Sequence, residues 1–252
     1  MNTVRKELNL RDLGNIEASN GRLIQKECFY RSAGLNTFQE KELEEIKALG
    51  LKAILDLRSK EERNRHPDPN IGVPILFYDE FRPMYMDDVD FSWNGMLSIG
   101  EKGLEQRVLR VKYYEQLPFN NPYLNKAISL VRDKQTPFLF HCASGKDRTG
   151  LMAIVLLALL GVSDDRIIED YVLSNEYRKC FIDQAYIDHA KLIEEYPELH
   201  PIIVETCGVK KEMGEAMIQS IKTRYGDWGT YFQEEFGLDP QERQKLMRYY
   251  TK

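Results

Sequence analysis

The residues best suited to chemistry lie in one short segment of the 252-residue chain, HCASGKDRTG, which runs from His141 to Gly150. Within it Cys142 precedes Arg148 by six positions, and the segment joins a short apolar run to a long apolar one. A thiol and a guanidinium at this spacing bracket a tight turn that leads into a helix. Such a turn can hold a tetrahedral oxyanion beside a thiolate. The spacing therefore predicts a phosphate site with a sulfur nucleophile.

The backbone of the predicted turn supplies most of the phosphate contacts. Successive N–H groups can curl into a nest around the phosphate oxygens, and the N-terminus of the following helix adds positive potential. The Arg148 guanidinium suits two-point binding of phosphate, which a lysine does not reproduce. Gly145 permits backbone angles that other residues avoid. The predicted phosphate-binding residues are Ala143, Ser144, Gly145, Lys146, Asp147 and Arg148.

The nucleophile must be ionised at neutral pH. A cysteine with a pKa of about 8.5 is only ~3% thiolate at pH 7, whereas a pKa of about 5.5 makes it ~97% thiolate. This difference amounts to about 4 kcal/mol, and a helix dipole supplies at most about 2 kcal/mol. We therefore expect the loop amides, Arg148 and the Thr149 hydroxyl to supply the rest, while His141 braces the loop by hydrogen bonding.

Short β-rich runs alternate with amphipathic helical patterns, which indicates an α/β fold with a mostly parallel central sheet flanked by helices. Strands are predicted at residues 28–32, 52–57, 75–81 and 136–141, the last one directly before the cysteine. Helices are predicted at residues 39–49, 103–116, 123–134, 151–160, 164–174, 175–196, 210–225 and 240–250. No repeat or linker divides the chain, so we expect a single domain over residues 1–252 with a helical lid or cap around 177–225.

Composition argues against several classes of protein. A net charge of −5 disfavours nucleic acid as a partner. Four scattered cysteines do not suit a disulfide scaffold or a structural zinc site. This favours a reduced, cytoplasmic setting, although a leader removed from the N-terminus would be compatible with export. The longest apolar run, residues 151–160, is much shorter than the about 20 residues of a membrane-spanning helix, so we expect no stable membrane insertion.

The HCASGKDRTG segment matches the H-C-x5-R-[ST] signature of cysteine-dependent phosphatases, and its fuller form resembles a bacterial family of atypical protein-tyrosine phosphatases with dual or triple specificity. Further motifs resemble the same family: NLRDLG, GR and YRS within residues 9–32, DLRS at 56–59 and DYVLSN at 170–175. The resemblance implies the cysteine-dependent phosphatase fold. It also implies that Cys142 forms a cysteinyl-phosphate that water hydrolyses, and that Arg148 stabilises the phosphoryl oxygens. Lys146 adds a second cation, Thr149 donates to the departing thiolate, and no metal or cofactor is required.

The proton donor to the leaving group is less clearly marked. Related enzymes often place an aspartate within a Trp-Pro-Asp sequence, which this chain lacks. One candidate is Asp147 inside the phosphate loop, which the resemblance favours. The other is the acidic group before Trp93, formed by Asp87, Asp88 and Asp90.

Asp56 is a further candidate for a supporting role. It ends a predicted strand near the expected site, where its carboxylate could orient Lys146 or Arg148. A strand-end cap or a salt bridge with Arg58 or Arg31 is an equally good interpretation.

The resemblance implies phosphotyrosine-containing proteins or phosphoinositides as substrates. Lys146 favours multiply phosphorylated head groups, whereas the acidic net charge opposes work at a membrane. Two other functions compete, a non-catalytic phosphate-recognition module and a rhodanese-type sulfur transferase; the combined Cys142, Arg148 and Thr149 set argues against both. Basic residues of the predicted lid are interpreted as a solvated face: Arg178, Lys179, Lys210 and Lys211.

Overall fold

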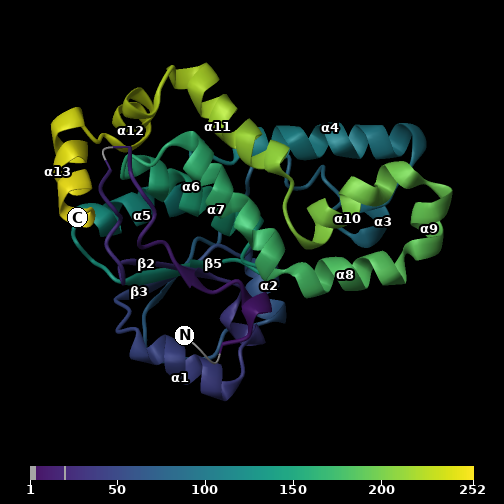
Figure 1. Ribbon diagram of the computed structural model, residues 1–252, viewed down its shortest axis with the longest axis horizontal. Helices are drawn as coiled ribbons and strands as arrows, with labels where there is room; N and C mark the ends of the chain where they lie inside the picture. The colour runs from purple at the N-terminus through teal and green to yellow at the C-terminus, as the bar shows by residue number, and fades with distance from the viewer. Residues whose placement is uncertain (1–3, 20) are drawn as a thin grey trace.

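A computed structural model describes residues 4–19 and 21–252, and its centre is a five-stranded sheet in the order β1-β2-β5-β3-β4 (Figure 1). Four strands run parallel: β2 (Phe29–Ser32), β5 (Phe138–His141), β3 (Ala53–Asp56) and β4 (Ile75–Leu76). The edge strand β1 (Arg11–Asp12) pairs antiparallel with β2. The predicted α/β class with a mostly parallel sheet is confirmed.

The three central strands are buried on both faces, because every residue of β2, β3 and β5 is buried. Parallel strands of this kind read as continuous apolar runs rather than as alternating patterns. β5 lies in the middle, and its last residue pairs with Ser32 of β2 and Asp56 of β3. Ligands bind beyond the carboxyl ends of strands in such sheets, so the sheet delivers the residues that follow His141 to a central position.

Helices cover both faces of the sheet (Figure 1). On one face α1 (Glu40–Ala48) packs through Ile46 into a small apolar cluster. On the other face lie α5 (Pro122–Arg132) and α6 (Asp147–Leu159), which belong to the main core. Every residue of α6 from Thr149 onward is buried, as expected of a helix that is apolar all round.

The start of α6 differs from the prediction. The apolar run placed the helix at residues 151–160, but it begins at Asp147. The Gly150 N–H donates to the Lys146 carbonyl at 2.7 Å, so helical hydrogen bonding starts inside the loop. Asp147 and Arg148 are therefore in the first helical turn, where hydrophobic periodicity gives no signal.

Four more helices complete the main body: α7 (Asp164–Tyr177), α11 (Lys211–Tyr225), α12 (Trp228–Phe236) and α13 (Pro240–Tyr250). α11 was expected within the cap, but its Met217 and Ile221 are fully buried in the main core.

The cap extends to one side of the sheet, at the right of Figure 1. It comprises α3 (Trp93–Met96), α8 (Lys179–Asp188), α9 (Ala190–Glu195) and α10 (His200–Cys207), which pack around two small apolar clusters of their own. α4 (Gly100–Gln116) connects the cap with the core, because its C-terminal turn carries the buried Tyr113 and Tyr114.

Several short elements depart from the predicted pattern. The strand predicted at 75–81 shrinks to the two residues of β4, and the helix predicted at 175–196 is divided among the end of α7, α8 and α9. α2 (Lys60–Arg65), α10 and α12 were not predicted, and three 3-10 turns, η1 (Lys6–Leu8), η2 (Leu35–Thr37) and η3 (Pro197–Leu199), join longer elements. Among the described residues, none of the helices has the length and apolar character needed to cross a bilayer.

Candidate active site

The candidate nucleophile, Cys142, follows the last residue of the central strand. Cys142 is buried, with only 3% of the residue exposed. Burial raises the pKa of the Cys142 thiol, but the charge of Arg148 and the hydroxyl and backbone N–H of Thr149 outweigh it, so the pKa lies below its usual value. The Thr149 hydroxyl is buried and makes no hydrogen bond of ordinary geometry within the described part of the chain, which leaves it available to the sulfur.

The loop after Cys142 is held in shape by Gly145. This glycine has φ +68°, a left-handed conformation that disfavours side chains. A Cβ atom there would lie 2.5 Å from the carbonyl carbon and oxygen of Ser32. The loop is thus pressed against the end of β2, and only glycine fits this approach.

A buried network of side chains hydrogen-bonds to the carbonyl oxygen of Gly145. The Asn9 side-chain amide donates to it at 2.7 Å and the Arg31 guanidinium at 3.1 Å. Arg31 also donates to Asp170 at 2.7 Å, and Arg11 donates to the second oxygen of that carboxylate at 2.9 Å. The motifs near residues 9–32 and 170–175 therefore meet in space and fix the loop from behind.

Gly150 has a related packing role at the start of α6. A Cβ atom on Gly150 would lie 2.6 Å from the ring of Tyr171 in α7. The last glycine of the loop motif thus allows α6 and α7 to approach closely, and α7 carries Asp170 into the network.

Arg148 forms a two-point ion pair with Glu62 of α2. Its Nη1 donates to Glu62 Oε2 at 2.6 Å and its Nη2 donates to Oε1 at 2.7 Å. Nη1 also donates to the Leu57 carbonyl at 3.2 Å. Burial opposes the charge of Arg148, but Glu62 and the Cys142 sulfur raise the pKa of Arg148 well above its usual value. The guanidinium is therefore charged and fixed in orientation.

Sequence reasoning missed Glu62. A signal for it was present, because Ser59 and Glu62 form a capping box. The Ser59 N–H donates to Glu62 Oε2 at 2.7 Å, and the Glu62 N–H donates to the Ser59 hydroxyl at 3.2 Å. The box places α2 at the end of β3, which brings Glu62 to Arg148.

Asp147 and Lys146 contact one another. Lys146 Nζ lies 2.7 Å from Asp147 Oδ2 and donates to the Glu205 carbonyl at 3.0 Å. The other oxygen of Asp147 accepts a hydrogen bond of 2.6 Å from the Tyr114 hydroxyl. The expected second cation of the phosphate loop is therefore already engaged by a carboxylate and a carbonyl.

These groups surround a cavity of about 310 Å³. Its walls combine residues of the phosphate loop with apolar and polar side chains from α2, the segment before α3, the end of α4 and the cap. They are Glu62, Met86, Phe91, Met96, Tyr113, Tyr114, Ala143, Ser144, Lys146, Asp147, Arg148, Glu205 and Thr206. Asp147 is thus on the wall of the cavity that Arg148 also lines.

The alternative acids do not line this cavity. Asp87 faces a neighbouring cavity of about 260 Å³ and forms a 3.1 Å ion pair with Arg82. Asp90 accepts a hydrogen bond from the Ser92 N–H at 2.9 Å. The Asp88 carbonyl accepts one from Gln106 at 3.3 Å. Arg148 lines both cavities, but only Asp147 among the described candidate proton donors shares a cavity with the loop residues Ala143, Ser144 and Lys146.

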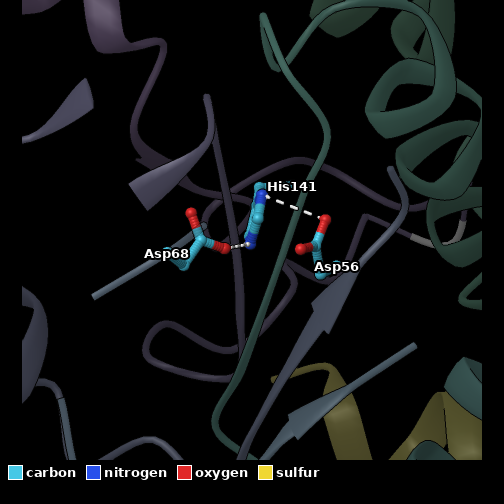
Figure 2. A group of neighbouring side chains, drawn as sticks. All are labelled: Asp56, Asp68 and His141. Carbon is cyan, nitrogen blue, oxygen red and sulfur yellow. Dashed lines mark ion pairs between the residues drawn. The ribbon is translucent and has the colours of Figure 1, made fainter. Parts of the chain in front are cut away.

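Asp56, Asp68 and His141 form a buried cluster beneath the loop (Figure 2). His141 Nε2 lies 3.1 Å from Asp68 and Nδ1 lies 3.8 Å from Asp56. Burial lowers the pKa of His141, but the close contact with Asp68 and the charges of both carboxylates raise it overall. These ligand atoms lie within 4.8 Å of one another, as in a metal site.

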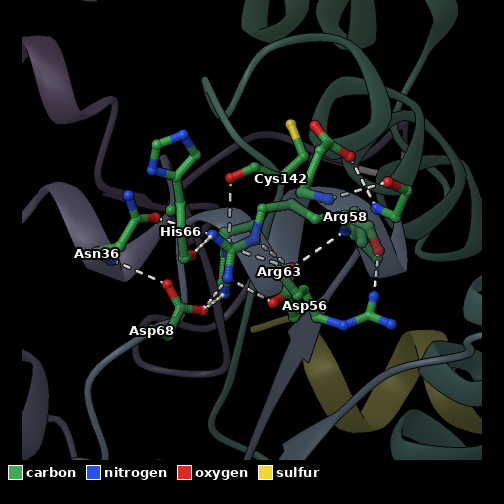
Figure 3. A network of polar contacts seen from close by, with 12 residues as sticks. Asn36, Asp56, Arg58, Arg63, His66, Asp68 and Cys142 are labelled. Carbon is green, nitrogen blue, oxygen red and sulfur yellow. Dashed lines mark hydrogen bonds and ion pairs between the residues drawn. The ribbon is translucent and has the colours of Figure 1, made fainter.

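Arg58 occupies the centre of this cluster (Figure 3). Its Nη2 lies 2.7 Å from both Asp56 and Asp68, and its Nη1 donates to Asn36 and to the His66 carbonyl, each at 2.8 Å. The guanidinium supplies the positive charge that a metal ion would otherwise bring. Asp56 therefore pairs with Arg58 and His141, and no direct contact with Lys146 or Arg148 is found among the described residues.

Arg178 was interpreted from the sequence as part of a solvated face, but it is buried. It is 9% exposed, donates to the Cys207 carbonyl at 2.5 Å and reaches the Ser144 carbonyl of the phosphate loop at 3.3 Å. The reason is its position at the junction of α7 and α8, where the cap meets the loop. Lys179 and Lys211 are exposed as expected, in ion pairs within their own helices.

Comparison with known proteins agrees with this geometry. Residues 3–252 match the sequence pattern of the tyrosine phosphatase family. The chain belongs to this family. As a tyrosine phosphatase it is an enzyme that acts on phosphorylated substrates.

Three curated relatives of this tyrosine phosphatase carry related names. A putative tyrosine-protein phosphatase from Cupriavidus necator is 26% identical over 239 residues, which cover 92% of this chain and 82% of the relative. The triple specificity protein phosphatase PtpB from Mycobacterium tuberculosis is 27% identical, covering 81% of this chain and 84% of the relative. A tyrosine-protein phosphatase from Nostoc commune is 29% identical, covering 61% and 50% respectively.

Proposed function

We propose that this tyrosine phosphatase hydrolyses phosphomonoesters through a cysteinyl-phosphate on Cys142. The thiolate attacks phosphorus, an S–P bond forms, and the P–O bond to the leaving group breaks. Asp147, which carries a proton once the phosphorylated substrate is bound, gives that proton to the departing oxygen and becomes a carboxylate. In the second step Asp147 takes a proton from water, the water oxygen attacks phosphorus, and the S–P bond breaks with its electron pair returning to sulfur.

The loop groups share this work. Arg148, held by Glu62, binds two phosphoryl oxygens and stabilises the charge that spreads over them in a loose transition state. The backbone N–H groups from Ala143 to Arg148 bind the rest of the phosphate. Thr149 donates to the sulfur as it departs, with His141 bracing the loop from below. The observation that carries the proposal is the arrangement of the loop after Cys142, which places Asp147 and Arg148 on the wall of one cavity. The charge of Arg148 also lowers the pKa of the Cys142 thiol.

Phosphotyrosine is the substrate that the cavity favours. Its walls include Met86, Phe91, Met96, Tyr113 and Tyr114, which suit the faces of an aryl ring. A phosphoinositide needs further cations for its additional phosphates, and Lys146 is already paired with Asp147. We therefore rank phosphoinositides below phosphotyrosine as substrates. From the relative named for triple specificity, we also propose activity on phosphoserine and phosphothreonine.

A substrate panel tests this order. Phosphotyrosine peptides, phosphoserine peptides and short-chain phosphoinositides are compared by kcat/KM under one set of conditions. The expected result is a higher kcat/KM for phosphotyrosine than for the other two classes. A phosphoinositide hydrolysed faster than every phosphotyrosine peptide would reverse the assignment.

Cys142→Ser tests the chemistry itself. The wild-type enzyme should hydrolyse an aryl phosphate in a vanadate-sensitive reaction, and Cys142→Ser should lose that turnover while it still binds vanadate or phosphate. Cys180→Ser is the matched control, because Cys180 is an exposed free cysteine. Turnover that survives in Cys142→Ser, or wild-type phosphate binding without turnover, contradicts the proposal.

A reducing compartment such as the cytoplasm suits this chemistry. The four cysteines are free, and three of them are buried. A thiolate nucleophile must stay reduced to react. Cell fractionation tests the compartment, and recovery of the protein in the culture medium would contradict it.

A further inference from the structure

Each oxygen of the Asp147 carboxylate contacts a different side chain, one from α4 and one from the residue directly before Asp147. The Tyr114 hydroxyl donates to Oδ1 at 2.6 Å, and Lys146 Nζ lies 2.7 Å from Oδ2. Two contacts on opposite oxygens fix both the position and the rotation of a carboxyl group. Asp147 is 25% exposed in its side chain, so the group that they fix still faces the cavity.

Tyr114 is a permanent donor at this position. It lies on α4, is 3% exposed and packs edge-on against Tyr113 with ring centroids 5.6 Å apart. Burial and then the charge of Asp147 raise the pKa of Tyr114 well above its usual value. The hydroxyl therefore keeps its proton and offers it to Asp147 as a hydrogen bond, without taking part in proton transfer.

The other contact is anchored by the cap. Lys146 Nζ donates to the backbone carbonyl of Glu205 in α10 at 3.0 Å. The Glu205 carboxylate in turn accepts a 2.7 Å hydrogen bond from Arg110 of α4. Arg110 lies one helical turn before Tyr114. One helix, α4, therefore positions both partners of Asp147. It carries Tyr114 itself, and its Arg110 binds Glu205, whose backbone carbonyl holds Lys146.

We propose that Tyr114 is a positioning residue for proton transfer, which orients the Asp147 carboxyl group toward the oxygen of the leaving group. The inference rests on the proposed function, in which Asp147 is the proton donor. The proton that moves belongs to Asp147, and Tyr114 retains its own. Loss of the Tyr114 hydroxyl leaves Asp147 with Lys146 as its remaining side-chain partner and lets the carboxyl rotate away from the substrate.

The experiment compares two aryl phosphates that differ in their need for a proton. Phenyl phosphate has a poor leaving group, whereas p-nitrophenyl phosphate has an activated one. kcat/KM is measured for the wild type, Tyr114→Phe, Asp147→Asn and the double variant. Tyr231→Phe is the matched control, because Tyr231 is a fully buried tyrosine whose hydroxyl donates to the Pro118 carbonyl at 2.8 Å, away from the cavity.

Tyr114→Phe should lower kcat/KM for phenyl phosphate about tenfold, the equivalent of one hydrogen bond to a charged group. It should change kcat/KM for p-nitrophenyl phosphate less than about twofold. In the Asp147→Asn background the Tyr114→Phe change should cost nothing further on either substrate, because the group it orients no longer donates a proton. Tyr231→Phe should leave both substrates unchanged.

The outcomes separate this inference from the mechanism beneath it. If Asp147→Asn slows both substrates equally, Asp147 is not the proton donor and the proposed function needs another acid. If Asp147→Asn is selective for phenyl phosphate but Tyr114→Phe slows both substrates equally, or costs the same factor with and without Asp147, only the role of Tyr114 is overturned. A Tyr114→Phe protein that does not fold, while Tyr231→Phe folds, assigns Tyr114 to stability and also overturns it.

Discussion

Arg148 and Glu62 face each other across two parallel hydrogen bonds of 2.6 and 2.7 Å, although 86 positions separate them in the chain. The pair fixes the plane of the guanidinium that is proposed to bind phosphate. Burial raises the pKa of Glu62, but hydrogen bonding and the charge of Arg148 lower it overall. Both partners are therefore charged at neutral pH.

Glu62→Gln should reduce kcat/KM on aryl phosphates about tenfold, because a neutral amide keeps the shape but loses one charge-assisted hydrogen bond. Glutamine also preserves the capping box. Glu44→Gln is the control: it removes an exposed ion pair with Lys47, changes the unfolding free energy by less than about 1 kcal/mol, and should leave kcat/KM unchanged. Equal kcat/KM for Glu62→Gln and wild type would show that the guanidinium does not depend on Glu62.

Asp147→Asn should lower kcat/KM on phenyl phosphate by about a hundredfold or more, the usual contribution of general acid catalysis. The loss on p-nitrophenyl phosphate should be far smaller, because its leaving group departs without a proton. Asp87→Asn, which alters the neighbouring cavity instead, should leave the ratio of the two rates unchanged. A ratio that moves with Asp87→Asn and not with Asp147→Asn would transfer the role to Asp87.

Gly145→Ala should lower kcat/KM by about a hundredfold, the effect of misplacing reacting groups by roughly 1 Å. Its Cβ would meet Ser32 at 2.5 Å, and its φ of +68° disfavours alanine. Gly237→Ala separates the two causes, because Gly237 is left-handed at φ +61° but has no atom within 4 Å of an added Cβ. That control should cost about 1 kcal/mol of stability and no activity. Full activity in Gly145→Ala would contradict the close packing of the loop on β2.

Asp170→Asn should destabilise the fold by about 3–5 kcal/mol at pH 7, because it leaves buried arginines without a charged partner. Burial raises the pKa of Asp170, but Arg11 and Arg31 lower it overall. Its stabilisation is therefore present above the unfolded pKa of about 3.9 and is lost as pH falls through the lower folded pKa.

Urea unfolding of wild type and Asp170→Asn tests this dependence. The difference in unfolding free energy should be constant between about pH 5 and 8 and should narrow below about pH 4. Asp183→Asn, which removes an exposed pair with Lys179, should change stability by less than about 1 kcal/mol. A difference for Asp170→Asn that persists unchanged into acid would show that the carboxylate charge is not what stabilises the network.

The amino-acid sequence by itself determined the position of the candidate catalytic loop, the strand before it and the parallel α/β class. These features depend on local properties: the order of residues from His141 to Gly150, the apolar runs of the buried strands, and the positive φ that Gly145 accepts. The motifs around Arg11, Arg31 and Asp170 were also visible, but their common purpose was not, because both arginines meet Asp170 only in the folded chain, where Arg31 also donates to the Gly145 carbonyl.

Only the tertiary structure decided which side chains orient the loop. Glu62 reaches Arg148 because α2 follows the end of β3, and Tyr114 reaches Asp147 because α4 returns from the cap to the core. Arg178 was predicted at the surface, but it is buried between α7 and α8, where its guanidinium donates to the Cys207 and Ser144 carbonyls. Hydrogen bonds between residues tens of positions apart leave no periodic trace in the chain, because their geometry exists only once the helices are packed.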